Sequence, residues 1–444
     1  MLARFFQLDR HGTTPVREIQ AGLTTFAAMA YILAVNPAIL AAGGMPREGL
    51  VTVTALAAAA STLIMALFTN FPLALAPGMG INAYFSFTVC LGLGVPWQSA
   101  LGLVFINGFA FLALSVSGIR EKIINIIPYQ LKMAITCGVG LFIAFIGLKN
   151  GGLIVDDANT LVTHGNLGSP AVLLFFGGLL LTIILVTRGV PGAIILSILL
   201  TTLAGLFIPD GHGGHLTNWP EQAVAWPASM GDTFLQLNFN YFAQDPVKAT
   251  TVVLTLLLIA LFDNIGTLVG VAQRAGLLDA DGRLPGAGKA LVADSLGVIV
   301  SSLFGTSNVV SYVESASGVA AGGRTGLVGV TVAVLFLLAL FFTPLILAMP
   351  AVATAPALVV VGIFMFQSVA ELNLKDFHQV APAFLIILGT PLTFSIAEGI
   401  GLGLLTFAVV SLCTGRARQV SWLIYVLAAI FGAHLFRDLF ARLF

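Results

Sequence analysis

Four acidic residues interrupt long apolar runs of this sequence, where a charged side chain is costly. A carboxylate at the centre of a membrane helix costs about 2.5–3.5 kcal/mol. No Lys, Arg or His lies at a comparable depth in those runs to offset the charge. These groups should therefore carry a proton, face a wet cavity, or bind a cationic or hydrogen-donating guest. A neutral acid that hydrogen-bonds between helices is the other interpretation. The four are Asp263, Asp294, Glu314 and Glu398.

Asp263 and Glu314 are the strongest candidates for a binding site. Asp263 breaks the run TTVVLTLLLIALFDNIGTLVGVA, and Thr267, four residues later, shares its helix face. Glu314 lies in GTSNVVSYVESASGVAAGG, which is rich in Ser, Thr, Gly and Val. This composition predicts a short β-branched strand and then a half-helix that begins near 312–315. Such a half-helix would point free backbone N–H groups at the middle of the membrane, which is tolerated only where the backbone lines a cavity or is buried in protein.

A second interrupted segment occupies the corresponding place in the first half of the chain. The stretch LALAPGMGINAYFSF carries Pro77, Gly78 and Gly80 ahead of Asn82. Paired interrupted segments indicate the binding site of a transporter, with two kinked packing helices as the alternative. The first apolar run, GLTTFAAMAYILAVNP, adds the hydroxyl of Thr25 as a candidate ligand, although threonine in membrane helices usually bonds to its own backbone.

The composition places most of the chain in lipid. Of its 444 residues, 58% are hydrophobic and only 9% are charged, whereas a soluble protein has about 25% charged residues. This excludes a soluble enzyme and a secreted disulfide scaffold. The zero net charge offers no basic face for nucleic acid. Three distant cysteines predict neither a disulfide framework nor a metal or cofactor site, and the N-terminal stretch predicts no removable signal peptide.

The apolar runs predict an all-α polytopic membrane protein with about fourteen spans. A span needs about 20 mainly apolar residues. Seven such runs lie on each side of a long polar stretch, so a second half of similar fold would enter the membrane from the opposite face, as in inverted-repeat transporters. A last apolar piece covers 420–436. The expected spans are 19–41, 50–69, 72–93, 97–117, 129–148, 170–187 and 190–208, followed by 247–272, 288–304, 306–322, 326–348, 351–370, 380–396 and 397–414.

The basic residues predict a cytoplasmic N-terminus. If each span crosses once, fourteen of the nineteen Lys and Arg residues fall on the side of the N-terminus, three on the other side and two in the C-terminal tail. This bias agrees with the positive-inside rule. The long polar stretch, with four acidic residues and one basic residue between 210 and 248, then lies outside.

Several of these motifs resemble a known family. FDNIGTLVGVAQRAGLLD and SYVESASGVAAGGRTGL resemble the signatures of the AzgA-like purine permeases, a branch of the nucleobase/cation symporter-2 family, and LALAPGMGINAYF and AGLTTFAAMAYILAVNP resemble its third and first segments. The similarity covers essentially the whole chain except the last apolar piece. It implies two inverted repeats of seven segments, with short β-strands in the broken third and tenth. The implied divisions are 1–118 and 247–348 for a core domain, 119–208 and 349–415 for a gate domain, 209–246 for an extracytoplasmic loop, and 416–444 for a C-terminal segment.

The resemblance also implies roles for individual residues. Asp263 matches an acid that hydrogen-bonds the base, and Tyr312 matches an aromatic position that stacks on it. Some relatives carry His four residues after the first acid, where this chain has Thr267, so a proton pathway would run through carboxylates. The candidate substrate-binding residues are Thr25, Ile81, Asn82, Asp263, Thr267, Ser311, Tyr312 and Glu314, and the candidate proton-coupling residues are Asp263, Asp294 and Glu314.

These observations predict a secondary active transporter of the bacterial inner membrane. We expect it to import adenine, guanine or hypoxanthine together with protons, sodium being the alternative coupling ion. The resemblance implies an elevator-type movement in a homodimer. A purine fits the acids, because its ring N–H groups form charge-assisted hydrogen bonds to a carboxylate and its face stacks on aromatic rings. The alternatives are an anion carrier of the same architecture, a membrane-embedded enzyme such as an aspartyl protease, and a channel.

Overall fold

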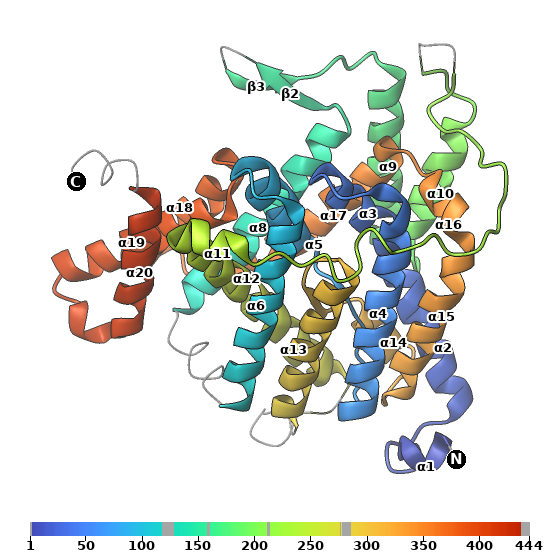
Figure 1. Cartoon of the computed structure of the whole chain (residues 1–444), viewed down its shortest axis with the longest axis horizontal. Helices are drawn as coiled ribbons and strands as arrows, with labels where there is room; N and C mark the ends of the chain where they lie inside the picture. The colour runs from blue at the N-terminus through green and yellow to red at the C-terminus, as the bar shows by residue number, and fades with distance from the viewer. Residues whose placement is uncertain are drawn as a thin grey trace.

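The computed structural model describes residues 2–117, 128–157, 160–210, 214–275, 277 and 286–436. Within these ranges, only the backbone is described at positions 2, 262, 263, 265, 266, 269, 270, 273 and 274. The described part is mostly helical, as the composition predicts. Most of the long helices run between the end of the molecule that carries the N-terminus and the end that carries the hairpin of β2 (Ile154–Asp157) and β3 (Leu161–His164) (Figure 1).

The first half begins with a bent span. The hydroxyl of Thr14 accepts a hydrogen bond from the N–H of Arg17 at 3.4 Å, and Pro15 takes the first helical position, which its fixed φ favours. The helix is interrupted at Ala30 and Tyr31 and then resumes. The elements of this half are α1 (Leu2–Phe5), α2 (Pro15–Met29), α3 (Ile32–Ala42), α4 (Arg47–Thr69), β1 (Leu75–Pro77), α5 (Met79–Ala83), the π-helix η1 (Tyr84–Gly92), α6 (Trp97–Val116), α8 (Tyr129–Asn150), β2, β3, α9 (Pro170–Thr187) and α10 (Ala193–Gly205).

The second half contains the other broken segment. Helix α13 ends at Gly305, whose φ of 95° favours glycine, and the chain then turns into a short strand. The elements are α11 (Asn240–Gln244), α12 (Pro246–Arg274), α13 (Ala287–Phe304), β4 (Val309–Ser311), α14 (Ser315–Ala320), α15 (Leu327–Ala339), η2 (Leu340–Phe342), α16 (Thr343–Leu347), α17 (Ala351–Phe366), η3 (Gln367–Glu371), α18 (Phe377–Leu392), α19 (Ile396–Cys413), η4 (Ala417–Gln419) and α20 (Trp422–Leu435).

The lengths of the helices confirm a multi-pass membrane protein. Among the described residues, nine helical stretches are long and apolar enough to cross a membrane, the first of them Pro15–Ala42. Five further apolar helices are shorter: η1 together with α5, α10, the first part of α12, α18 and α20. The expected count of fourteen spans stays a prediction. The expected span 326–348 is helical in three consecutive pieces, α15, η2 and α16, and Pro344 lies in the first turn of the last one.

The long connection between the halves lies across helix ends on the side opposite the N-terminus (Figure 1). Its backbone N–H groups donate to three helical elements: Ala225 to the carbonyl of Phe341 at 3.0 Å, Leu235 to Leu303 at 2.8 Å, and Asn238 to Gln98 at 3.1 Å. The connection therefore ties the ends of η2, α13 and α6 together.

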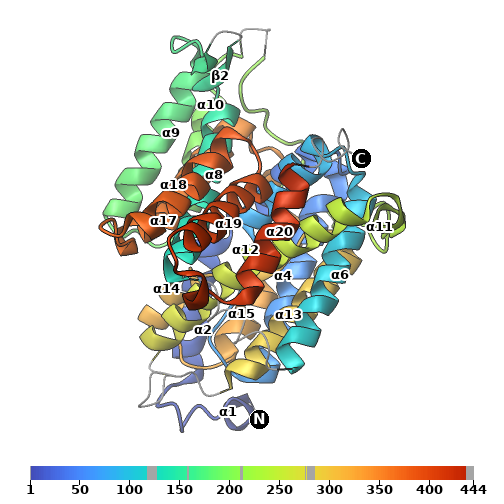
Figure 2. The ribbon, with the colours of Figure 1, turned by 90° about the vertical axis from the view of Figure 1, so that its left-hand side faces the viewer.

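The helices pack in two sets (Figure 2). In one, α4 packs against α13 and α15, α15 also contacts α2, and α13 contacts α6. In the other, α8 packs against α17 and α18, α18 against α19, and α9 against α17 and α10. Each set combines helices from both halves of the sequence. The division into a core and a gate domain at the expected residue boundaries stays a proposal, and the boundary at 118 and 119 lies outside the described residues.

The two broken segments meet as a pair of strands, which confirms the predicted β-strands in the third and tenth segments. Strands β1 and β4 are antiparallel, with Leu75 opposite Ser311 and Pro77 opposite Val309. The N–H of Gly78 extends the pairing by donating to the carbonyl of Asn308 at 3.0 Å. Because each strand satisfies the backbone of the other, this irregular structure survives in the protein interior.

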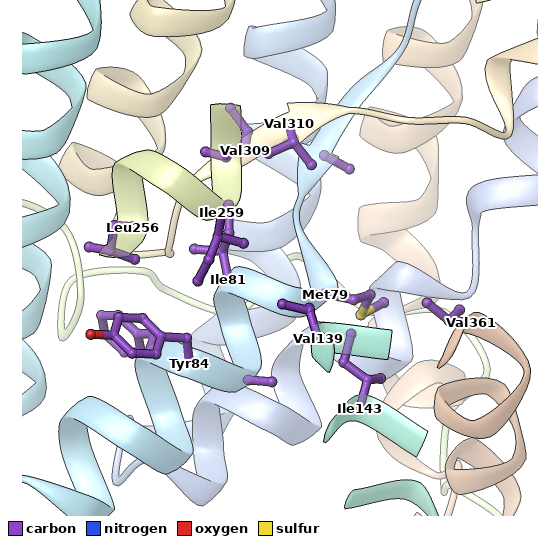
Figure 3. Close-up of a cluster of buried hydrophobic side chains, with 14 of the residues drawn as sticks. Met79, Ile81, Tyr84, Val139, Ile143, Leu256, Ile259, Val309, Val310 and Val361 are labelled. Carbon is purple, nitrogen blue, oxygen red and sulfur yellow. The ribbon is translucent and has the colours of Figure 1, made fainter. Parts of the chain in front are cut away.

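A cluster of buried apolar side chains fills the space beside the strand pair (Figure 3). It joins the first set of helices to α8 and α17 of the second. Gly80 of α5 has no side chain. A Cβ at this position would collide with Val139 of α8 and push the two helices apart. The labelled members are Met79, Ile81, Tyr84, Val139, Ile143, Leu256, Ile259, Val309, Val310 and Val361, all buried.

Candidate functional site

Glu314 lies where strand β4 turns into helix α14. The hydroxyl of Tyr31, from the break between α2 and α3, donates to Oε1 of Glu314 at 2.7 Å. Glu314 itself is partly exposed, and 56% of the surface of the neighbouring Val313 is exposed. Tyr31 therefore holds this carboxylate in one orientation, on a residue that keeps some exposed surface.

One expectation about this turn is wrong. The N–H groups at the start of α14 were expected to be free. Instead, the N–H groups of Ser315, Ala316 and Ser317 donate to the carbonyls of the residues three positions earlier, at 2.9–3.1 Å. The chain tightens into short turns before the helix, and these turns use the donors. These three N–H groups are therefore not free to bind a ligand.

Tyr312 joins the two broken segments. Its N–H donates to the carbonyl of Ala74 at 2.9 Å, and its hydroxyl donates to the carbonyl of Pro77 at 2.6 Å. The side chain is 5% exposed. The structure thus gives Tyr312 a bond to β1, and its stacking on a base stays a prediction.

A buried chain of hydrogen bonds between Asp294, Asn264 and Ser311, called the relay below, supports strand β4. The amide of Asn264 on α12 donates to Oδ2 of Asp294 on α13 at 2.7 Å. The carbonyl oxygen of the same amide accepts the N–H of Ser311 at 2.8 Å. All three residues are buried. Asp294 therefore orients Asn264, and Asn264 holds the end of the strand that leads to Glu314.

Asn82 and Ile81 lie on α5, on the other broken segment. The side-chain oxygen of Asn82 accepts a hydrogen bond from the hydroxyl of Ser307, which precedes β4. Ile81 is fully buried in the apolar cluster of Figure 3. Both residues thus hold the two broken segments together, and contact of either with a ligand stays a prediction.

Thr25 and Thr267 are both buried but lie on different helices. Thr25 of α2 faces Gly318 of α14, where an added Cβ would collide with its hydroxyl oxygen. Thr267 lies on α12, one turn beyond Asn264. Thr25 therefore contacts the half-helix that follows Glu314.

The remaining two acids are not joined to this group by any described contact. Asp263 lies on α12, but its side chain is outside the described residues, so its role stays a prediction. Glu398 lies in the first turn of α19, where its N–H donates to the hydroxyl of Ser395 at 3.3 Å. This is a helix-capping position, in agreement with a structural role. Among the described residues, no group of three or more His, Cys, Asp and Glu could hold a metal ion.

Sequence reasoning missed two residues of the site. Tyr31 lies 283 residues from Glu314 in the sequence, and no local pattern indicates their contact. Asn264 was not among the candidates, although an amide in an apolar run must find a donor and an acceptor inside the protein and was therefore a usable signal. The site as described contains an oriented carboxylate, just beyond a paired strand, that could accept hydrogen bonds from a guest.

Known proteins resemble this chain over nearly its whole length. The sequence matches the permease family, Xan_ur_permease, over residues 16–402. The adenine permease AdeQ of Escherichia coli strain K12 is 41% identical over 431 residues, covering 97% of this chain and 95% of that protein. The guanine/hypoxanthine permease PbuG of Bacillus subtilis strain 168 is 43% identical over 436 residues, covering 96% and 98%.

Among solved structures, the fold is similar to the transmembrane domain of a cyanobacterium bicarbonate transporter, BicA. The TM-score is 0.64 over 87% of this chain and 96% of that one, at 15% sequence identity. At this identity the likeness concerns the fold alone, and it confirms the all-α polytopic membrane fold that the sequence predicts.

Proposed function

We propose that this chain, which belongs to the permease family, is a secondary active transporter that imports purine nucleobases. Two relatives that match more than nine-tenths of it are named as permeases for adenine and for guanine and hypoxanthine. The observation in the structure that carries the proposal is the carboxylate of Glu314, a partly exposed residue that Tyr31 orients at the junction of the broken segments.

The site suits a flat, uncharged base with ring N–H groups. A carboxylate offers only acceptors, so it pairs with two donors of one base in charge-assisted hydrogen bonds. Tyr31 takes one lone pair of Oε1 and fixes the plane of the group. The proposed ligands beside Glu314 are Thr25, Ile81, Asn82, Asp263, Thr267, Ser311 and Tyr312.

We further propose coupling to protons through Asp263, Asp294 and Glu314. A proton on one of these carboxylates removes a charge that is costly in a low-dielectric interior, so the loaded site moves more easily than the ionised one. Proton and base then each favour the same state and tighten one another. The movement proposed is an elevator-type shift of the set that contains α2, α4 and α13 against the set that contains α8 and α17, in a homodimer of the bacterial inner membrane with a cytoplasmic N-terminus.

An anion carrier is the second candidate, because the fold resembles that of a bicarbonate transporter. The carboxylate at the junction argues against it, since a buried anion raises the cost of bringing a second one nearby. Competition separates the two: unlabelled purines should block uptake of a labelled purine, and sulfate or bicarbonate should not.

The direct test uses purified protein in proteoliposomes. We expect radiolabelled adenine, guanine or hypoxanthine to accumulate when the outside is acidic, and to be recovered chemically unchanged. The same bases under a sodium gradient without a proton gradient should reach only equilibrium. Absence of uptake of all three bases under both gradients would overturn the proposed function, and accumulation driven by sodium alone would overturn the proton coupling.

Tyr31→Phe should raise the KM for the base by about tenfold, which corresponds to about 1.4 kcal/mol. The substitution removes only the hydroxyl that orients Glu314, and the ring still fills its buried place. Uptake at several base concentrations separates KM from the maximal rate. A KM equal to that of the unmodified protein would show that the bond to Glu314 does not orient the carboxylate for binding.

A further inference from the structure

Another acid, Glu18, takes no part in the contacts described above. It belongs to the first turn of α2 and is fully buried. Four donors surround its carboxylate. Oε1 accepts from the hydroxyl of Thr13 at 2.8 Å and from the N–H of Arg324 at 2.9 Å. Oε2 accepts from the N–H of Thr325 at 3.1 Å and from its hydroxyl at 2.7 Å.

This environment selects a carboxylate and no other side chain. A carboxylate has two acceptor oxygens and no donor, which matches the four donors. A carboxamide of the same shape would turn its NH₂ group toward one of the two pairs. The threonine hydroxyls can rotate to accept, but the backbone N–H of Arg324 or Thr325 cannot. One buried N–H group would then lose its partner in either orientation.

The two backbone donors belong to the link between α14 and α15. The guanidinium of Arg324 folds back and donates from Nη1 to the carbonyl of Val319 at 2.8 Å and to that of Gly323 at 2.7 Å. The bond to Val319 attaches Arg324 to the last turn of α14, and the bond to Gly323 lies within the link itself. Glu18 thus holds the end of the half-helix that Glu314 begins.

Helix α2 contacts the half-helix at two further levels. The first is at Gly318 of α14, where an added Cβ would contact the carbonyl oxygen of Ala21 at 2.7 Å and collide with the hydroxyl of Thr25. At the far end, just beyond α2, Tyr31 donates to Glu314. The half-helix is therefore attached to the first span at its end by Glu18, along its length by close packing, and at its start by Tyr31.

We infer that Glu18 is a positioning residue for the base: it fixes the half-helix of the tenth segment on the first span, so that Glu314 and Tyr31 keep their geometry while the site moves. Glu18 does not touch the substrate. It acts through Arg324, Thr325 and α14. The inference rests on the proposed function for its effect on base binding, and on the structure alone for its effect on the half-helix.

The experiment compares Glu18→Gln with Thr13→Val in purified protein. Thr13→Val removes one of the four donors but leaves all bonds from Glu18 to the tenth segment. We expect Glu18→Gln to raise the KM for radiolabelled adenine, guanine or hypoxanthine by about tenfold or more, with a smaller effect on the maximal rate. Thr13→Val should leave the KM within about twofold of the unmodified protein. A general loss of folded protein would lower the maximal rate and leave the KM unchanged.

Hydrogen exchange gives a second measurement that needs no substrate. Glu18→Gln should speed exchange of the amides between 315 and 326 by about tenfold, because the link opens more often, and Thr13→Val should not. If Glu18→Gln yields no folded protein, Thr325→Val serves instead: it removes one hydroxyl donor and should raise the KM by about threefold. Unchanged exchange, an unchanged KM, or equal effects of the Glu18 and Thr13 substitutions would overturn the inference. Failure of the unmodified protein to take up any base would overturn the proposed function, while the exchange measurement still judges Glu18.

Discussion

Glu314→Gln is expected to abolish purine uptake while the protein still folds. Glutamine keeps the shape and one acceptor oxygen, so the hydroxyl of Tyr31, 2.7 Å from Oε1, retains a partner. A base that donates two hydrogen bonds loses one acceptor and meets an NH₂ group in its place. Hydrogen bonds to charged groups contribute about 1.5–3 kcal/mol, so affinity should fall by about 10- to 100-fold, and the loss of an exchangeable proton should remove concentrative uptake as well.

The measurement is initial uptake of each radiolabelled base at matched protein levels, with outside pH varied. Glu398→Gln is the matched control, because it changes the same residue type in an apolar run but lies at a capped helix start in the other set of helices. We expect that variant to keep its uptake within about twofold. Normal affinity and normal pH dependence in Glu314→Gln would exclude Glu314 from both binding and coupling.

The parts of this site that could be predicted are those whose sequence pattern lies in one continuous stretch of the chain. Pro77 and Gly78 in one run, and the Ser, Gly and β-branched residues around Val309 in another, predicted the broken segments, because each violates the pattern of a membrane helix. The structure pairs the strands of the two segments, a contact that neither run indicates by itself. The register, with Leu75 opposite Ser311, could not be read, because both segments are buried on all sides and offer no alternation of polar and apolar residues.

The contacts that orient the acids are long-range and could not be predicted. Glu18 accepts from residues 306 and 307 positions away, and its own surroundings in the sequence, an acidic first turn, are typical of an ordinary exposed helix start. The free N–H groups expected before Ser315 were wrong for a different reason. The chain enters this helix through short turns, in which the N–H groups of Ser315, Ala316 and Ser317 already donate to carbonyls three residues earlier.

Asn264→Leu is expected to have the second large effect. Asn264 accepts from the N–H of Ser311 and donates to Asp294, and all three groups are buried. Leucine leaves the N–H of Ser311 without this acceptor, which costs about 1–3 kcal/mol, and removes a donor from a buried carboxylate, which costs more. The melting temperature should therefore fall by several degrees or more, and the protein that does fold should show little base uptake, because β4 no longer holds Glu314 in place.

The substitution Asp294→Asn tests whether Asp294 only supports strand β4 through Asn264 or also carries a coupling proton. An asparagine there still presents an oxygen to the amide of Asn264, so the strand should stay in place and the melting temperature should change little. If Asp294 also carries a coupling proton, this variant should bind the base and exchange it across the membrane but fail to accumulate it against a gradient. Thermal unfolding in detergent, followed by exchange and accumulation assays in proteoliposomes, distinguishes the two roles.

A stable, fully active Asn264→Leu protein would show that the relay does not position the strand, and the route from Asp294 to Glu314 would have to be abandoned.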